Sequence, residues 1–140
     1  MERFLIDQML MRLGRWLRLL GLDVANPRDA SDIELLEMAK RDHRTLITRD
    51  RRLEQSCRTA GAACILIESS FLEEQLMEMR DRGIPLHLNP QRCTICNSPL
   101  RIADNTSRTT WQCTECKKLY WVGTHWKKME TMLDEIRSRR

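Results

Sequence analysis

Two pairs of cysteines in the C-terminal third of the sequence restrict its fold more than any other feature. Each pair has the spacing Cys-x-x-Cys, and sixteen residues separate the two pairs. Two thiolates at this spacing can reach one side of a tetrahedral ion, so two such pairs complete a four-sulfur shell for zinc. A segment of roughly 35 residues cannot bury enough apolar surface to fold without such a crosslink. We therefore predict a structural zinc site with the ligands Cys93, Cys96, Cys113 and Cys116.

Two disulfides or four unrelated buried cysteines are the alternatives to zinc. Residues 1–6 carry no apolar stretch of the kind found in secretory signals, and the longest apolar runs are too short to span a membrane. We therefore expect a cytoplasmic protein that does not enter membranes, a compartment in which disulfides are rare.

Upstream of the zinc module, short apolar runs alternate with helical patterns. Such alternation predicts a parallel sheet flanked by helices. We expect an α/β domain over residues 1–83, a linker over 84–91, and a zinc ribbon with a C-terminal helix over 92–140. The strands are expected at 3–6, 23–25, 45–48 and 64–67, and the helices at 10–20, 31–41, 50–60, 70–83 and 127–138.

Helix starts are marked by two capping boxes. Ser31 and Ser70 are each followed three residues later by Glu, so each is expected to cap a helix. In the first of these helices, the apolar spacing predicts that Ile33, Leu36 and Ala39 face inward.

Three aspartates are expected at the carboxyl ends of the strands, where open parallel sheets bind ligands. Asp7 follows the first strand, Asp32 opens the first capped helix, and Asp50 follows the third strand. If these carboxylates converge, they form a hard-oxygen site suited to Mg²⁺ or Mn²⁺, which can activate water against a phosphodiester. The alternative is that each aspartate only caps a helix.

Six blocks of the sequence are familiar as a set, at residues 4–7, 13–24, 32–36, 46–50, 92–97 and 113–126. In these blocks the sequence resembles the PIN-like RNase family named for the C-terminal region of the Mut-seven exonuclease. The resemblance extends over nearly the whole chain.

The resemblance implies a PIN-like nuclease fold joined to a zinc ribbon, a pairing also found in an endonuclease of small-subunit rRNA maturation. It implies that Asp7, Asp32 and Asp50 are catalytic ligands of Mg²⁺ or Mn²⁺, and that Thr48 orients the loop carrying Asp50. Other PIN sites often have a fourth acid, for which Glu54 is the candidate here. The implied substrate is RNA, structured or ribosomal.

Positive charge is concentrated toward the end of the chain. Residues 1–83 have a net charge of −1, whereas residues 84–140 have a net charge of +5. Such a basic segment fits nucleic acid, and its aromatic residues can stack on bases, form the ribbon core or bind a protein partner. Trp121 is expected in that core. The candidate RNA-binding residues are Arg12, Arg15, Lys117, Lys118, Lys127 and Lys128; together with Arg18, the first two form a row that either contacts phosphate or is only a solvated face.

Two functions remain open from the sequence. One is a metal-dependent endoribonuclease whose ribbon aids RNA binding. The other is a non-catalytic RNA- or ribosome-binding zinc-ribbon protein.

Overall fold

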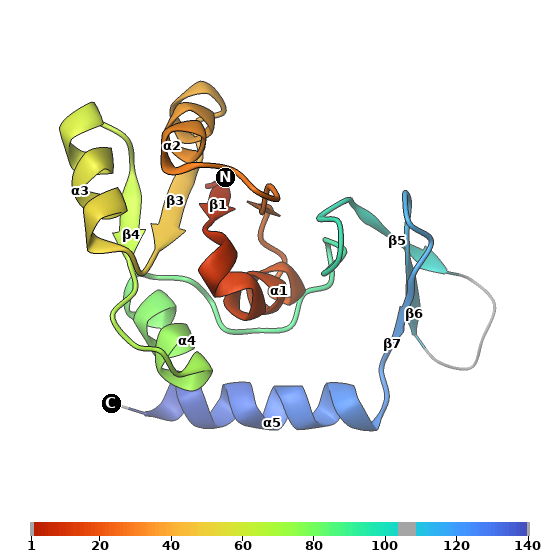
Figure 1. The fold of residues 1–140 in the computed structure, drawn as a ribbon. Coiled ribbons are helices and arrows are strands. Elements are labelled where there is room, and N and C mark those ends of the chain that lie inside the picture. Colours follow the sequence, from red (N-terminus) through yellow and green to blue (C-terminus); the bar gives the residue numbers. More distant parts are fainter. Residues whose placement is uncertain (1, 104–108, 140) are drawn as a thin grey trace.

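The computed structural model describes residues 2–103 and 109–139 of the chain. Its first part is a four-stranded sheet with the order β2-β1-β3-β4, and every strand pairing in it is parallel (Figure 1). The predicted parallel sheet is therefore confirmed. Its strands are β1 (Phe4–Ile6), β2 (Val24–Ala25), β3 (Thr45–Thr48) and β4 (Cys64–Leu66).

Helices cover both faces of this sheet because successive strand side chains point to opposite sides. A short 3-10 helix η1 (Gln8–Leu10) precedes α1 (Met11–Leu19); the other helices are α2 (Asp32–Arg41), α3 (Arg51–Ala60) and α4 (Leu72–Asp81). Leu5 and Leu46 pack into one apolar cluster with α2 and α3. Phe4, Ile6 and Ile47 pack into the other cluster, with α1 and α4.

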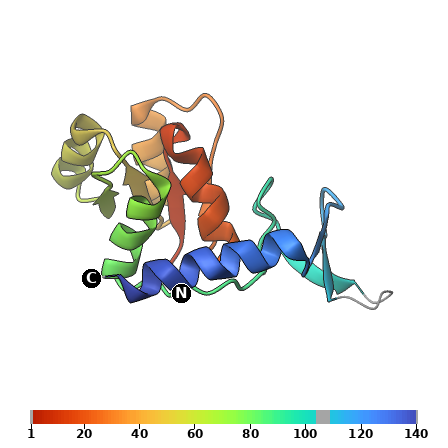
Figure 2. The same ribbon diagram turned by 90° about the horizontal axis from the view of Figure 1, so that it is seen from below.

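The second part is an antiparallel sheet of three strands in the order β5-β6-β7, followed by a long helix. These elements are β5 (Leu100–Ala103), β6 (Thr110–Cys113), β7 (Leu119–Trp121) and α5 (Thr124–Ser138). Helix α5 runs back from the ribbon along the α/β part to α4 (Figures 1 and 2). Its Leu133 and Ile136 are buried in the same cluster as Phe4. Within the described residues, no helix is long and apolar enough to cross a membrane.

The segment 84–91, predicted as a linker, is packed between the two parts. Leu86 is only 1% exposed and belongs to the core cluster of β1 and α1. The Asn89 N–H donates to the Leu19 carbonyl at 2.8 Å. Gly21 has a φ of +92°, and a Cβ there would lie 2.9 Å from the backbone oxygen of Asn89. Close approach and backbone conformation therefore both require glycine at this crossing.

Helix α2 begins as predicted but buries a different face. Ser31 and Glu34 form the reciprocal capping box. However, Ile33 is 70% exposed, and Leu35 is buried in its place. The prediction for Ile33 is wrong because α2 presents Leu35 and Ala39 to the sheet.

The second predicted capping box does not form. Helix α4 has Phe71 as its N-cap residue, with no side-chain cap, and the Ser69 Oγ accepts the Phe71 N–H at 3.0 Å. The Glu78 carboxylate reaches back along α4 to accept the N–H groups of Glu68 and Ser69 at 2.8 and 3.0 Å. These bonds fix the entry to α4 without Ser70.

The edge strand β2 is bordered by side chains from α1 and from the ribbon. The Val24 N–H donates to Asn97 Oδ1 at 3.0 Å, and the Val24 carbonyl accepts from Arg18 Nε and Nη2 at 2.9 and 2.7 Å. Arg18 Nη1 also donates to the Thr94 carbonyl at 2.8 Å. Arg18 is only 6% exposed, so it does not share the solvated face predicted for its row.

Asp23 adds a second set of bonds between the α/β part and the ribbon, next to the edge strand β2. Its Oδ1 accepts from Asn97 Nδ2 at 2.7 Å and from Arg44 Nη1 at 2.9 Å, and Arg92 lies 3.5 Å from Oδ2. Burial opposes ionisation of Asp23, but the bonds from Arg44 and Asn97 outweigh it, so the pKa of Asp23 lies below its usual value. The two parts thus meet through a bonded and charged network.

Candidate functional site

Asp7 and Asp50 are joined at the carboxyl edge of the sheet by one hydroxyl group. The buried Thr48 Oγ1 donates to Asp7 Oδ2 at 2.9 Å and accepts the Asp50 N–H at 3.0 Å. The Asp7 N–H also donates to the Ile47 carbonyl at 3.0 Å, which ties the end of β1 to β3. These contacts fit the role that the family resemblance implies for Thr48.

Both aspartates also cap the helices that follow them. Asp50 Oδ1 accepts the N–H groups of Arg52 and Leu53 at 2.8 and 3.3 Å at the start of α3. Asp7 Oδ1 accepts the Met9 N–H at 3.4 Å. Among the described residues, Asp50 Oδ2 accepts no hydrogen bond. Capping therefore leaves carboxylate oxygen lone pairs available at this edge.

Asp32 stands apart from this pair. It lies exposed in the first turn of α2, and among the described residues Asp7, Asp32 and Asp50 do not form a group close enough to hold one metal ion. Glu54 is buried on α3 and forms an ion pair with Arg58. Its charge is thus already compensated within α3.

The edge has the donor chemistry of a hard-cation site. Asp7 and Asp50 supply carboxylate oxygens, the ligands that Mg²⁺ and Mn²⁺ prefer. The Thr48 hydrogen bond fixes the rotation of the Asp7 carboxylate, as outer contacts do in metal sites. Asp7 and Asp50 therefore supply the ligand type that a divalent cation needs, but among the described residues the three aspartates do not converge as the four cysteines do.

The four cysteines of the ribbon converge. Their sulfur atoms all lie within 4.8 Å of one another. The Cys93 and Cys116 sulfurs are 3.6 Å apart, and those of Cys96 and Cys113 are 3.5 Å apart. Zn–S bonds of about 2.3 Å in a tetrahedron place the sulfurs about 3.8 Å apart, so this group can hold zinc. Within residues 2–103 and 109–139, no other group of three or more such side chains is as close.

The charges around these sulfurs also favour a cation. A hydrogen bond from Ser98 lowers the pKa of Cys96 to about 6. A backbone bond from Lys118 favours the Cys116 thiolate, but burial and the neighbouring sulfurs outweigh it and raise the pKa of Cys116 to about 11. Crowded thiolates cannot all ionise alone, and a divalent ion removes this repulsion.

Comparison with known families decides the relationship of the chain. The model of the Mut7-C RNAse domain matches residues 2–133. The chain belongs to this family. The match covers both the aspartate edge and the four cysteines, and the family's description points to nuclease activity on RNA. Comparison with curated proteins gives no match.

In this Mut7-C RNAse domain, the basic residues predicted to bind RNA fall on different surfaces. Arg15 and Lys118 line one hollow between α1 and the ribbon. Arg12 lines a separate hollow with α4 and α5. The remaining three, Lys117, Lys127 and Lys128, are exposed on the ribbon and the start of α5.

The ribbon aromatics divide between packing and exposure. Trp126 is 8% exposed and stacks on Trp111 with ring centroids 5.4 Å apart. The Tyr120 hydroxyl accepts the Thr94 N–H at 3.1 Å and lies 3.1 Å from the Cys93 sulfur. Trp121 is 47% exposed, so its predicted place in the core is wrong, and Trp126 occupies that role.

Sequence reasoning missed the bridging role of Arg18 and did not single out Asn26 and Arg28. Arg18 bonds across the two parts, and the other two line the same hollow as Arg15. The Asn26 Oδ1 is buried and has no hydrogen-bond partner among the described residues. No local pattern could have identified these residues, because the hollow is formed by segments distant in the sequence.

Proposed function

We propose that this Mut7-C RNAse domain is a metal-dependent endoribonuclease. Asp7, Asp32 and Asp50 would hold Mg²⁺ or Mn²⁺, which would supply an activated water and neutralise charge on the phosphodiester. The four cysteines would hold a structural zinc ion, and the ribbon would contribute to RNA binding.

The observation that carries this proposal is the bonded unit of Asp7, Thr48 and Asp50. The Thr48 hydroxyl bonds the Asp7 carboxylate and the Asp50 backbone N–H. Helix capping alone does not need this link between the ends of β1 and β3, whereas a metal site needs its ligands held in a fixed relative orientation. The unit lies at the carboxyl edge of a parallel sheet, where ligands of such folds bind. Its residues fall within the matched range of a family described as an RNase domain.

The alternative is a non-catalytic RNA- or ribosome-binding protein with the same fold. Among the described residues the three aspartates do not form a close group, and Glu54 is paired with Arg58; both observations favour this alternative. The two proposals differ in whether the aspartates at this edge catalyse cleavage of RNA.

The deciding experiment compares the wild type with Asp7→Asn. Cleavage of a labelled RNA in Mn²⁺ is measured together with thermal melting, with and without Mn²⁺. We expect Asp7→Asn to abolish cleavage and the stabilisation by Mn²⁺. Its metal-free stability should stay within about 0.5 kcal/mol of the wild type, because the amide oxygen still accepts from Thr48 and the repulsion from Asp50 disappears.

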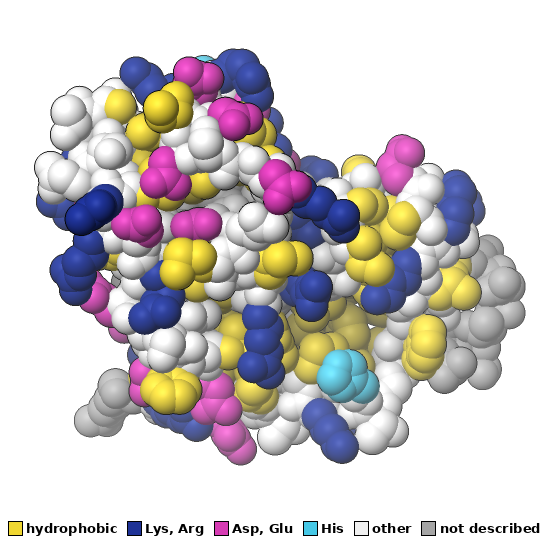
Figure 3. Space-filling view, in the orientation of Figure 1, with side chains coloured by type: hydrophobic (Ala, Val, Ile, Leu, Met, Phe, Trp, Pro, Cys, Tyr) yellow, Lys and Arg dark blue, Asp and Glu magenta, His cyan; other side chains and the backbone are white. Residues whose placement is uncertain are grey.

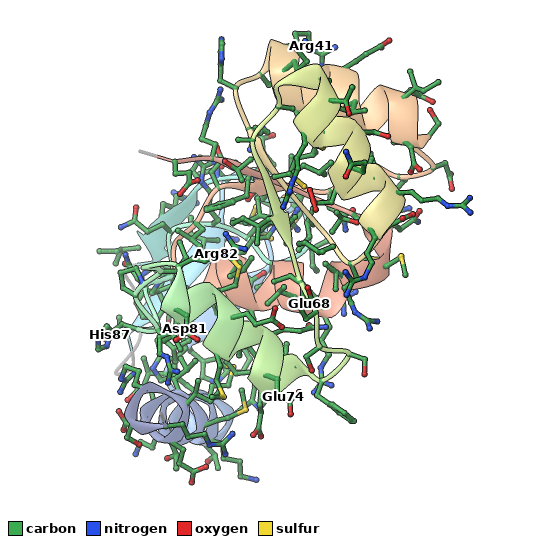
Figure 4. All side chains as sticks on the ribbon, turned by 90° about the vertical axis from the view of Figure 1, so that its left-hand side faces the viewer. Arg41, Glu68, Glu74, Asp81, Arg82 and His87 are labelled. Atoms are coloured by element: carbon green, nitrogen blue, oxygen red, sulfur yellow. The ribbon has the colours of Figure 1, made fainter. Side chains whose placement is uncertain are left out.

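Asp81→Asn is the matched control. Asp81 lies exposed at the end of α4. Figure 4 labels it together with Glu68, which follows β4 at the carboxyl edge of the sheet, and Arg41, which lies at the opposite edge; Asp81 is away from Glu68. This variant should cleave like the wild type. Undiminished cleavage by Asp7→Asn would show that Asp7 is only a cap, a role that asparagine fills about as well as aspartate.

A further inference from the structure

A groove lies between the α/β part and the ribbon. One section is a hollow of about 590 Å³ whose lining includes Met11, Arg15, Arg28 and Ile95. A second hollow of about 300 Å³ lies against β7 and the start of α5, and its lining includes Trp121. Thr94 and Lys118 line both hollows, so the two hollows adjoin at these residues; together they are here called the ribbon groove.

The ribbon groove is positively charged along its first section. Arg15, Arg18, Arg28 and Lys118 line it, and no carboxylate is among the described residues that line either hollow. Figure 3 shows hydrophobic side chains gathered in a recess between the α/β part and the ribbon, with basic side chains around it. This charge distribution complements a polyanion.

The rest of the lining suits unstacked bases. Ile95 is 60% exposed, and Trp121 adds an exposed aromatic ring. Flat apolar surfaces beside cations bind single strands, whose bases are free to stack on them, whereas the bases of a duplex are stacked on each other. The partnerless Asn26 Oδ1 at the first section can accept a hydrogen from a base amine or a ribose hydroxyl.

The first section of the groove also reaches the residue that follows Asp7 in the chain. Gln8 lines its first section, and Gln8 directly follows Asp7. We propose that single-stranded RNA binds along the ribbon groove, with its phosphates on Arg15, Arg28 and Lys118 and a base stacked on Trp121. This assignment rests on the proposed function for the class of ligand, and it names the strand state and the path.

Binding is measured separately from cleavage, in the Asp7→Asn background, by the anisotropy of a short fluorescein-labelled RNA over a range of salt concentrations. Arg15→Ala with Arg28→Ala should lower the slope of log affinity against log salt by about 1.4, since each single-strand phosphate contact contributes about 0.7. The control pair Lys40→Ala with Arg82→Ala removes the same charge from exposed sites outside the groove, and its slope should stay unchanged.

Trp121→Ala should weaken binding of the single strand roughly tenfold, as expected for one lost base stack. A hairpin duplex should bind more weakly than the single strand. Equal effects of the groove and control pairs, equal affinity for duplex and single strand, or no RNA binding would each overturn the inference. If the wild type cleaves no RNA but binding still depends on the groove residues, only the proposed catalysis is refuted. Retained zinc and an unchanged melting temperature show that each variant is folded.

Discussion

Arg18→Ala tests how strongly the two parts of the molecule are joined. Arg18 donates two hydrogen bonds to the Val24 carbonyl and one to the Thr94 carbonyl, and it is almost fully buried. Its removal leaves both carbonyl oxygens without these donors, one in the α/β part and one in the first cysteine pair.

The expected loss follows from these two acceptors. A buried polar group left unsatisfied costs about 1–3 kcal/mol, so two cost roughly 2–6 kcal/mol. Burial also lowers the pKa of Arg18 despite the raising effect of Cys93 and Cys96, so removing the guanidinium recovers part of its desolvation cost. Water from the adjoining hollow can reach the carbonyls, and we therefore expect a loss near the lower end, about 2–3 kcal/mol.

Urea denaturation of the zinc-loaded protein, followed by circular dichroism and tryptophan fluorescence, measures this loss. Three of the four tryptophans lie in the ribbon and at the start of α5, so fluorescence is weighted toward that part. In Arg18→Ala the fluorescence transition should move to lower urea than the circular dichroism transition, because the ribbon loses its attachment. Arg18→Lys should fall between, since one ammonium cannot reproduce the planar fork of donors.

Arg15→Ala is the matched control, because Arg15 is exposed on the same helix. It should change the unfolding free energy by no more than about 0.5 kcal/mol. If Arg18→Ala changes stability as little as Arg15→Ala does, and both probes report one transition, the attachment through Arg18 is not energetically important.

Further predictions concern the zinc site, the network at β2 and the aspartate edge. Purified protein should contain one zinc ion per chain, and Cys96→Ser should lose it; elemental analysis that finds no metal in the wild type would refute the site. Because the pKa of Asp23 is lowered in the folded state, its charge stabilises the fold above its unfolded pKa, and this contribution disappears as pH falls through the lower folded value. The stability difference between the wild type and Asp23→Asn should therefore be constant near neutral pH and shrink below about pH 4, and a constant difference in urea titrations across that range would contradict the assignment. Thr48→Val should reduce RNA cleavage more than it reduces RNA binding, and equal losses in the two assays would remove its orienting role. Replacing Lys117 and Lys118 with Glu should weaken RNA binding, most strongly at low salt, and an unchanged affinity would exclude the ribbon from binding.

Local patterns predicted the elements of this fold well. The alternation of apolar runs with capped helices identified the parallel sheet, because strand burial and helix capping are encoded by neighbouring residues. The cysteine spacing likewise predicted the close group of sulfurs. The position of Asp7 and Asp50 beside Thr48 follows from strand order, once the sheet is assumed to be parallel.

What could not be predicted depends on contacts distant in the sequence. Arg18 looks like a surface residue until Thr94, 76 residues away, is placed against it. The choice between Trp121 and Trp126 as the core aromatic depends on where α5 begins, since its early start brings Trp126 onto Trp111. Leu86 packs in the core cluster of β1 and α1, although the prolines and weak periodicity of its segment predicted a linker.

The bonds around Val24 have a consequence for the fate of the metal-free protein. An edge strand with open N–H and C=O groups can pair with a strand of another molecule. Here Asn97 and Arg18 occupy those two groups, and Asn97 directly follows Cys96, one of the four cysteines that can hold zinc. Loss of zinc would release Asn97 and open one side of β2 to intermolecular pairing. The zinc ion would thus hinder self-association, because it would hold the loop whose Asn97 covers the N–H group of the edge strand β2.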